Sequence, residues 1–592
     1  MSFVRLNKTQ IEQKIKFIGD YIRAENAATG SKLDANANVS SKNIATLSAE
    51  INKDINIQIN RKLMHNKITE LFGQECADEY VEQLESHLIY KHDETHLAPY
   101  CVSISMYPFL LDGLTKLGGE SKAPKHINSF CGNFINLAFA ISAHFAGAVA
   151  TVEFLTYFDY FCRLDYGDDY LTTHEKEVAD HFQWVIYSLN QPAAARGFQA
   201  VFHNISVFDE YYFKSLFDGF YFPDYTQPKW ETVSKLQEYF LTWFNNERTK
   251  ALLTFPVVTA AVLTENNDVK DEGFVQMLSK QMSEGNSFFV YMSDSADSLA
   301  SCCRLRNEMT DNTFSYSLGA GGVATGSISV MSLNMNRLAQ LGIDLEEQVK
   351  KMHKWQIAYR KIMEEYLEAG LLTAYDAGFI SLDKQFLTIG INGIPEAAEF
   401  MGHVVGNNTE YKNYVGSLLK TIYDANRSAT KEYGYKFNTE LIPAEGLGVK
   451  NSYWDKKDGL AVNRDCYNSY FYLVEDDNCN VLDKFVLHGK EIVQYLDGGS
   501  ALHLNLDHHP SQEGYREYFR VAAIAGCNYW TTNVKNTICN DCGEVSKETF
   551  TECPKCSSKN IDYGTRVIGY LKRISNFSKA RQSEAGKRVY HK

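Results

Sequence analysis

Short apolar runs that alternate with longer amphipathic stretches constrain the fold of this chain more than any other feature. From about Pro99 onward, runs of strand length recur between segments with helical periodicity, such as residues 345–372. Strands interleaved with helices are typical of parallel β/α architecture, in which each helix returns the chain to the next strand. We therefore expect an α/β barrel. The runs are residues 101–111, 193–208, 252–263, 286–295, 326–335, 387–394 and 501–508.

The size and charge of the chain exclude several classes of protein. A chain of 592 residues can bury a deep core, and its net charge of −14 argues against a nucleic-acid coat or a membrane-surface protein. The N-terminal sequence lacks the apolar core of a secretory signal, so we expect a cytoplasmic protein. Residues 127–152 hold no Asp, Glu, Lys or Arg, but their Asn, Ser and His side chains favour a buried helix over a membrane span.

Four cysteines near the C-terminus form the strongest local motif. They make two CxxC pairs separated by ten residues, and each pair can present two thiolates to one tetrahedral ion. Four sulfur ligands without an open position favour a structural zinc ion, and a rubredoxin-like iron site is the alternative. A zinc ribbon by itself would equally indicate nucleic-acid binding. The expected metal ligands are Cys539, Cys542, Cys553 and Cys556.

The segment Arg566-Val567-Ile568-Gly569-Tyr570 resembles the RVxGY motif of glycyl radical enzymes. Taken alone, a strand that ends in a turn glycine is the simpler interpretation. Its position, 13 residues after Cys556 and 23 residues before the C-terminus, resembles the terminal module of class III, anaerobic ribonucleotide reductases. A glycine suits a stored backbone radical because the absent side chain lets the radical carbon flatten. The resemblance implies such a radical on Gly569, generated by an activating enzyme that uses a 4Fe–4S cluster and S-adenosylmethionine.

The resemblance extends from about Asn43 to Lys592 and implies a ten-stranded α/β barrel of the glycyl radical enzyme and ribonucleotide reductase type. We expect a helical N-terminal region without a full ATP-cone and a C-terminal zinc site. The expected parts are a helical region at 1–95, a catalytic barrel at 96–530, the four-cysteine site at 531–560, and the glycyl radical segment with a basic tail at 561–592.

In the family that this chain resembles, the glycyl radical passes to a cysteine at the tip of a loop inside the barrel. The segment Ser301-Cys302-Cys303-Arg304 is similar to that loop and implies a thiyl radical on Cys303, with Cys302 as the alternative carrier. Cys101 occupies the place of the family's reducing thiol. Packed core cysteines are the plain alternative for these positions. The implied reaction is anaerobic reduction of ribonucleoside triphosphates to 2′-deoxyribonucleoside triphosphates.

Residues 442–448 resemble the family's phosphate loop, in which backbone N–H groups at a helix N-terminus point at phosphate. The implied substrate-binding residues are Pro443, Ala444, Glu445 and Gly446. A plain Gly-rich turn is the alternative. Glu445 could instead act as an acid or base near the ribose.

The expected partners follow from the same resemblance. Residues 326–330 read Gly-Ser-Ile-Ser-Val where formate-oxidising members have an Asn, so a thioredoxin- or glutaredoxin-like reductant is the alternative to formate. We expect a homodimer that binds dNTP or ATP effectors near residues 127–152. Seven Lys and Arg after Gly569 form a cationic tail, interpreted as solvent-exposed charge or as a docking strip for the activating enzyme.

Two other functions compete with this interpretation. A pyruvate formate-lyase-like glycyl radical enzyme also has adjacent cysteines, but lacks four cysteines just before the glycine and needs no reducing thiol such as Cys101. A zinc-ribbon nucleic-acid-binding protein would need a broader basic surface than the short tail provides. We therefore expect neither nucleic acid nor membrane as a partner.

Overall fold

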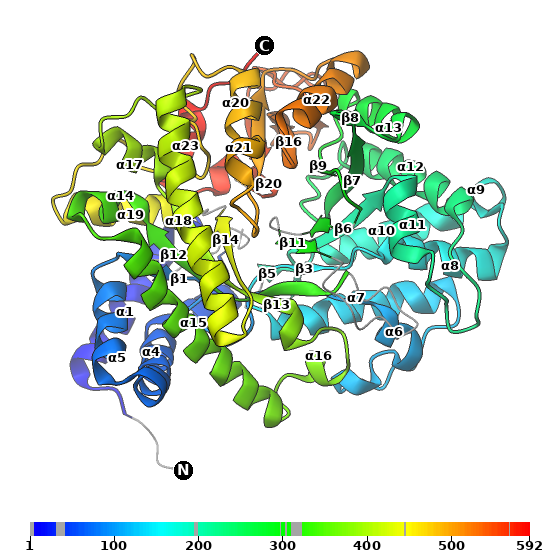
Figure 1. The fold of residues 1–592 in the computed structure, drawn as a ribbon. Helices are drawn as coiled ribbons and strands as arrows, with labels where there is room; N and C mark the ends of the chain where they lie inside the picture. The colour runs from blue at the N-terminus through cyan, green and yellow to red at the C-terminus, as the bar shows by residue number, and fades with distance from the viewer. Residues whose placement is uncertain are drawn as a thin grey trace.

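Ten β-strands close into a barrel built from two half-sheets (Figure 1). The computed structural model describes residues 5–30, 42–193, 199–296, 298–301, 305–308, 323–442, 446–566 and 569–592. Within each half-sheet the strands run parallel. One half-sheet comprises β2 (Cys101–Ser103), β3 (Val149–Ala150), β6 (His203–Phe208), β7 (Val257–Glu265) and β9 (Phe289–Ser293). The other comprises β12 (Thr325–Asn334), β13 (Gln385–Asn392), β14 (Phe437–Leu441), β15 (Leu502–Leu506) and β16 (Tyr529–Val534).

Two antiparallel seams and one bridge close the barrel. At one seam β12 pairs with β2, and at the other β16 pairs with β9. The ends of the strand order are joined by a parallel bridge between Glu440 of β14 and Gly499, which lies just before β15. Without this closure β14 and β15 would be the edge strands of the sheet, and the bridge joins their two ends. The ten-stranded α/β barrel expected from the sequence is therefore confirmed.

Burial on both faces explains the continuous apolar composition of the barrel strands. β7 reads Val-Val-Thr-Ala-Ala-Val-Leu-Thr-Glu, and its first seven residues are buried. β-Branched and small apolar side chains suit a strand that is covered on both faces. Pro256 interrupts this apolar run in the sequence but lies immediately before β7, where its missing N–H group leaves the strand pairing intact.

Helices form an outer ring around the sheet (Figure 1). The two longest, α15 (Leu345–Glu368) and α18 (Thr409–Tyr433), pack against each other and against β13 and β14. The Asp344 and Asn408 side chains cap their N-termini, and α18 ends at Gly434, which adopts a φ of 75°. Other helices of the ring are α6 (Tyr107–Asp112), α7 (Ile127–His144), α8 (Phe154–Tyr166), α10 (Glu175–Leu189), α11 (Glu210–Phe217), α12 (Trp230–Glu247), α13 (Glu272–Ser283), α14 (Met335–Leu341), α17 (Ile394–Phe400), α20 (Val481–Leu487) and α22 (Gln512–Ala525).

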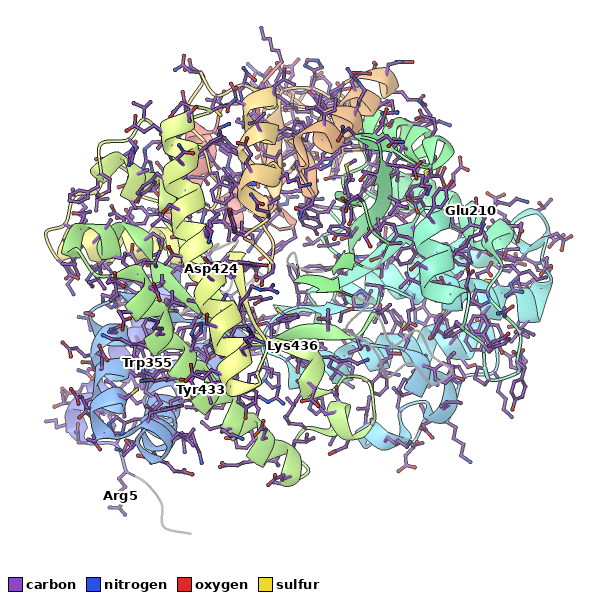
Figure 2. All side chains as sticks on the ribbon, viewed as in Figure 1. Arg5, Glu210, Trp355, Asp424, Tyr433 and Lys436 are labelled. Atoms are coloured by element: carbon purple, nitrogen blue, oxygen red, sulfur yellow. The ribbon has the colours of Figure 1, made fainter. Side chains whose placement is uncertain are left out.

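The N-terminal helices pack on the outside of α15. Trp355 of α15 points toward them, with its ring 5.5 Å from that of Tyr80 and its Nε1 donating to the Cys76 carbonyl at 3.2 Å (Figure 2). Because Trp355 and Tyr80 are both fully buried, this contact anchors the helical region to the barrel. The region comprises α1 (Lys8–Arg23), α2 (Ala27–Gly30), α3 (Ile44–Glu50), α4 (Lys53–Phe72) and α5 (Gln74–Glu85), followed by β1 (Ile89–Lys91), which pairs with β12.

The uncharged stretch 127–152 forms α7 and β3. Nine side chains of α7 are buried, and the helix packs against α8 and α10. Among the described helices, none combines the length and the apolar character that a membrane crossing requires. The expectation of a buried helix is confirmed.

A small antiparallel sheet carries the C-terminal segment. Its strands follow the order β18, β17, β19, β20. Beyond it, α23 (Lys579–Lys587) leads to an extended end in which His591 forms a bridge with Leu506 of β15, and the Val589 N–H donates to the Val474 carbonyl at 2.8 Å. The chain end is therefore packed onto the barrel. The strands are β17 (Asn536–Cys539), β18 (Val545–Ser546), β19 (Ile561–Arg566) and β20 (Leu571–Arg573).

The basic tail is neither solvent-exposed charge nor an open docking strip along its whole length. Lys572, Arg581 and Arg588 are buried. Glu584 accepts two bonds from Arg588, at 2.8 and 3.0 Å, and one from Arg581 at 3.2 Å. The Arg588 Nη1 also donates to the Arg566 carbonyl at 2.8 Å. This ion cluster joins α23 to the end of β19.

We expect Arg588→Met to lower the Tm and to expose the C-terminal segment to proteolysis. Burial alone would raise the pKa of Glu584, but the Arg588 and Arg581 guanidinium groups hold it below its ordinary value. Removing one partner of such a cluster costs about 3–5 kcal/mol. Because the pKa is depressed in the folded state, the Tm difference from wild type should be full above about pH 5 and shrink as the pH falls.

Thermal denaturation between pH 3.5 and pH 8 measures this difference. The control is Lys587→Met, a neighbouring exposed residue, which should leave the Tm unchanged. Equal Tm values for Arg588→Met and wild type at pH 7 would contradict a stabilising role for the cluster.

Candidate functional site

A β-hairpin lies between the two half-sheets at the position of the expected radical loop. Strands β10 (Ser298–Ser301) and β11 (Leu305–Glu308) pair antiparallel, with Ser301 opposite Leu305. β10 contacts β6, β7 and β9, whereas β11 contacts β12. The hairpin therefore reaches both halves of the barrel. Cys302 and Cys303 fall between the two strands, outside the described residues.

Cys101 is the first residue of β2 and is buried at the seam with β12. The backbone N–H of Ala148 donates to its Sγ at 3.3 Å. A Cβ at Gly147 would lie 2.5 Å from the same sulfur, so only a glycine lets the chain pass this close to the thiol. The backbone before β3 thus fixes the position of the Cys101 side chain.

Gly569 lies in the turn between β19 and β20, between the paired residues Arg566 and Leu571. The Arg566 Nη1 donates to the Gly569 carbonyl at 2.9 Å, while Nε and Nη2 donate to the Ser287 Oγ at 3.1 and 2.9 Å. The guanidinium also covers the ring of Phe289 at 4.7 Å. Burial lowers the pKa of Arg566 to about 10, so the group remains a cation at neutral pH.

Gly569 and Cys101 approach the same end of the first half-sheet. A Cβ built on Gly569 would lie 3.8 Å from Cζ of Phe202, the residue before β6. The Phe202 carbonyl accepts the N–H of Val149 at 2.9 Å. Val149 follows Ala148, which donates to the Cys101 sulfur. A short series of contacts therefore links the predicted radical glycine to the predicted reducing thiol.

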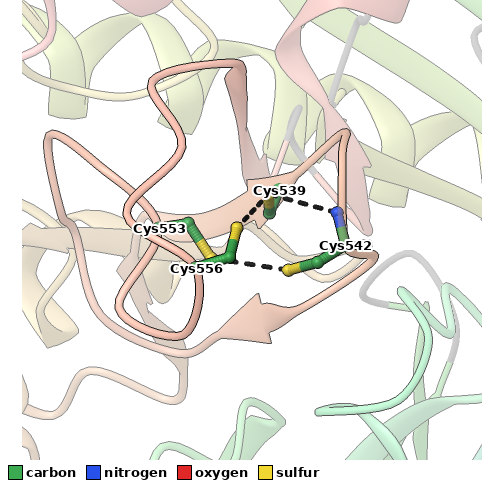
Figure 3. A group of neighbouring side chains, drawn as sticks. All are labelled: Cys539, Cys542, Cys553 and Cys556. Carbon is green, nitrogen blue, oxygen red and sulfur yellow. Dashed lines mark hydrogen bonds between the residues drawn. The ribbon is translucent and has the colours of Figure 1, made fainter.

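The four cysteines of the C-terminal motif converge on one point (Figure 3). Their sulfur atoms all lie within 4.8 Å of one another, with Cys539 and Cys556 3.7 Å apart and Cys542 and Cys553 3.6 Å apart. Four sulfurs at about 2.3 Å from a central zinc ion would be roughly 3.8 Å apart, so the geometry fits one tetrahedral ion. The backbone N–H of Cys542 lowers the pKa of Cys539 to about 7 and favours the thiolate that a metal requires.

This four-cysteine cluster is connected directly to the glycine segment. Cys539 ends β17 and is paired with Ile561, the first residue of β19. β19 then runs to Arg566, which holds the Gly569 carbonyl. A bound ion would therefore fix β17 to the start of β19, the strand that ends at Arg566 and leads to Gly569.

Of the four residues expected to bind phosphate, the structure describes only Gly446, and Pro443, Ala444 and Glu445 lie outside the described residues. Gly446 is the N-cap of α19 (Leu447–Lys457), and its carbonyl accepts the N–H of Lys450 at 3.1 Å. N–H groups in the first turn of a helix have no partner within the helix, so this end of α19 suits an anion.

The closed barrel, the hairpin between its halves and the glycine segment at one end define the class of glycyl radical enzyme and ribonucleotide reductase barrels. A family model described as anaerobic ribonucleoside-triphosphate reductase matches residues 49–591. A search of curated proteins found no match.

Solved structures agree with the family match. A structure described as an anaerobic ribonucleotide reductase is 27% identical with a TM-score of 0.86, over 98% of this chain and 93% of the other. The anaerobic ribonucleotide reductase of Thermotoga maritima in complex with dATP and CTP is 27% identical with a TM-score of 0.82, over 99% of this chain and 100% of the other. The same enzyme with dATP in its specificity site is 26% identical with a TM-score of 0.81, over 98% and 100%.

The chain belongs to the anaerobic ribonucleoside-triphosphate reductase family. It is an oxidoreductase that reduces ribonucleotides, as expected from the sequence, and the two competing functions are not favoured.

Arg566 lies in the RVxGY motif, but the sequence alone assigns it no function. Its contacts with Ser287 and Phe289 join positions about 280 residues apart in the chain, which no local pattern reveals. The Glu584 and Arg588 pair, by contrast, has the i,i+4 spacing of a helical ion pair and was accessible from the sequence.

We expect purified protein to contain one metal ion per chain and Cys542→Ser to lose it. Replacing one of four thiolates leaves an incomplete tetrahedron and lowers affinity strongly. Elemental analysis by mass spectrometry after gel filtration measures the ratio. The matched control is Cys527→Ser, a buried cysteine outside the cluster, which should retain the ion. Full metal content in Cys542→Ser would contradict the site.

Proposed function

We propose that this chain reduces ribonucleoside triphosphates with a radical stored on Gly569. The observation that supports this most directly is the position of Gly569 at the barrel end, with its carbonyl bound by the buried Arg566 cation. Spin on a glycyl carbon is shared with both flanking peptide groups, and a charge-assisted hydrogen bond to the carbonyl is stronger than a neutral one. Arg566 therefore holds the peptide group of Gly569 in place and stabilises the unpaired spin that its carbonyl shares.

In the proposed reaction, Gly569 takes a hydrogen atom from the thiol of Cys303, with Cys302 as the alternative carrier. The resulting thiyl removes the 3′-hydrogen of the ribose, and the 2′-hydroxyl leaves as water after taking a proton. Cys101 gives one hydrogen atom from the opposite side of the sugar, and a thiol of an external donor supplies the second electron and proton as a disulfide forms between the two sulfurs. The Cys303 thiol then returns the 3′-hydrogen, which regenerates its thiyl radical. Each turnover consumes two electrons and two protons and releases one water, so an external donor must restore the thiol.

A thiol-based reductant of the thioredoxin or glutaredoxin kind fits the surroundings of Cys101 better than formate. Ser327 is paired with Cys101 across the β2 and β12 seam. A Cβ at the preceding residue, Gly326, would lie 2.3 Å from the Cys101 carbonyl and 2.7 Å from the Gln385 side chain. No Asn side chain fits at position 326, which supports a relay without the formate-type Asn there.

The remaining partners are also proposals. Zinc is the ion that we assign to the four-cysteine cluster, because four sulfurs with no open position suit a redox-silent structural ion. A radical S-adenosylmethionine enzyme with a 4Fe–4S cluster would generate the radical in the cytoplasm. The Thermotoga maritima relative was solved with dATP and CTP. We assign the substrate phosphates to residues 443–446, and a dNTP or ATP effector site with a homodimer contact to α7.

We expect Gly569→Ala to abolish both the organic radical and deoxynucleotide formation. The added methyl group would make only an ordinary van der Waals contact with Phe202, and no other described atom lies within 4 Å, so the variant should fold. The assay incubates the protein anaerobically with an activating enzyme, S-adenosylmethionine, reductant and CTP, and records electron paramagnetic resonance and dCTP. Cys303→Ser should keep the radical but form no product, and Cys302→Ser should be tested beside it. A wild-type signal in Gly569→Ala would contradict the proposal.

We expect Arg566→Lys to reduce the glycyl radical per chain by about tenfold or more and to alter its hyperfine splitting. An ammonium group lacks the planar fork with which Nη1 bonds the Gly569 carbonyl while Nε and Nη2 bond the Ser287 hydroxyl, and a hydrogen bond to a charged group is worth roughly 1.5–3 kcal/mol. Spin quantification after activation measures the loss. The control is Arg520→Lys, a half-exposed arginine that pairs with Glu517. An unchanged signal in amount and shape would exclude the positioning role.

A further inference from the structure

Asn438 of β14 is fully buried, yet its carboxamide has no hydrogen-bond partner in the described part of the chain. Its exposed fraction is 0%, and both Nδ2 and Oδ1 lack a partner. Buried carboxamides are almost always bonded to protein, water or ligand. An unpartnered donor and acceptor on one side chain inside an enzyme barrel indicate a group that is not part of this chain.

The contacts of its two neighbours show that Asn438 faces the interior of the barrel. The Phe437 ring lies 4.5 Å from His353 of α15, and the Thr439 Oγ1 accepts from Nδ2 of Asn426 in α18 at 2.8 Å. Both helices belong to the outer ring (Figure 1). Successive side chains of a strand point to opposite faces, so Asn438 points inward.

Strand pairing places Asn438 on the same face of the sheet as Cys101, in a neighbouring row, because Ser327 is paired with Phe386, two residues before Thr388. Cys101 is paired with Ser327 across the seam, and Thr388 is paired with Asn438 between β13 and β14. The Ser327 Oγ and Thr388 Oγ1 lie 2.8 Å apart, which puts these two residues on one face. Directly paired residues share a face of the sheet, so all four side chains point into the barrel.

We propose that Asn438 binds the ribose hydroxyl groups of the ribonucleotide substrate. Neighbouring strands are about 4.8 Å apart, so three strand steps separate Cys101 from Asn438 by roughly 14 Å along the wall. Both side chains extend inward from a concave wall, so their ends lie closer together than their backbones. The carboxamide N–H donates to one hydroxyl and its oxygen accepts from the other. This inference rests on the proposed function.

A ribose ligand also explains why a carboxamide stands at this position. The vicinal diol offers a donor and an acceptor side by side, which a carboxamide matches without a net charge. The diol is common to all ribonucleotides, so the contact serves every base equally. A site built to bond a hydroxyl also discriminates against a sugar that lacks it, as the deoxynucleotide product does.

The test measures stability and substrate affinity in Asn438→Leu and Asn438→Ala. Asn438→Leu removes the polar atoms at nearly constant volume, and because no bond within the described chain is lost, its Tm should equal or exceed that of wild type. The KM for CTP, and the dissociation constant for CTP measured by calorimetry on unactivated protein, should rise about tenfold to a hundredfold in both variants. The glycyl radical yield should stay at the wild-type level.

The matched control is Asn426→Leu, which removes a buried carboxamide that is partnered on the outward face. Its Nδ2 donates to Thr439, and its Oδ1 bonds Nε2 of His353 at 2.8 Å. This variant should lower the Tm and leave the KM for CTP within about twofold of wild type. The pair of Asn variants therefore separates a substrate contact from a structural one.

Two results would overturn the inference while leaving the proposed function intact. One is a wild-type affinity for CTP in Asn438→Ala, which would mean that any loss in Asn438→Leu comes from bulk. The other is a lowered Tm with an unchanged KM in both variants, which would make Asn438 structural. Failure of activated wild-type protein to form dCTP or to bind CTP would instead overturn the proposed function, and this inference with it.

Discussion

A buried guanidinium joins the C-terminal segment to the barrel, and the position of Gly569 depends on it. Arg566 has no carboxylate partner in the described part of the chain. A second buried arginine, Arg248, lies nearby, and its own burial together with the charge of Arg566 lowers the pKa of Arg248 to about 9. Burying an unpaired charge is costly unless its donors are satisfied. Here the donors reach a backbone carbonyl and a hydroxyl, and aromatic faces cover both cations. The role of the buried Arg566 cation is therefore to orient the Gly569 carbonyl and the Ser287 hydroxyl.

Closure of the barrel by two antiparallel seams determines which side chains share its interior. The seam between β2 and β12 puts Cys101 beside Ser327, and the contact of Ser327 with Thr388 and the pairing of Thr388 with Asn438 extend the same inner face to β14. Polar residues on the inner face of a barrel reduce stability relative to an apolar filling, and they persist where a ligand needs them. The outer face of the same strands carries Phe437 and Thr439, whose contacts with α15 and α18 are complete. The outward-facing residues of β14 therefore contribute to stability, whereas we assign Asn438 on its inward face to the substrate.

Local patterns predicted the parts of this structure whose partners are close in the sequence. The CxxC spacing predicted that the four cysteines form one cluster, because each pair is complete within four residues, and the alternation of strands and helices predicted the barrel. The role of Arg566 and the unpartnered state of Asn438 could not be predicted, since both depend on strands that are adjacent only after folding. The burial of Arg588 was missed because a run of basic residues was interpreted without its spacing from Glu584. Cys303 and Pro443 to Glu445 remain predictions, outside the described residues.

The four-cysteine cluster lies at the opposite end of β19 from Arg566, which favours a mechanical role for an ion bound there. Gly569 lies in the turn of a hairpin, and hydrogen transfer between a backbone carbon and a thiol tolerates displacements of only a fraction of an ångström. A hairpin of two strands is marginally stable by itself. β19 is therefore held on one side by β17, which the cluster fixes through Cys539, and at its end by Arg588, which bonds the Arg566 carbonyl. β19 is thus constrained along one side and at its end, which holds the turn that contains Gly569 in place.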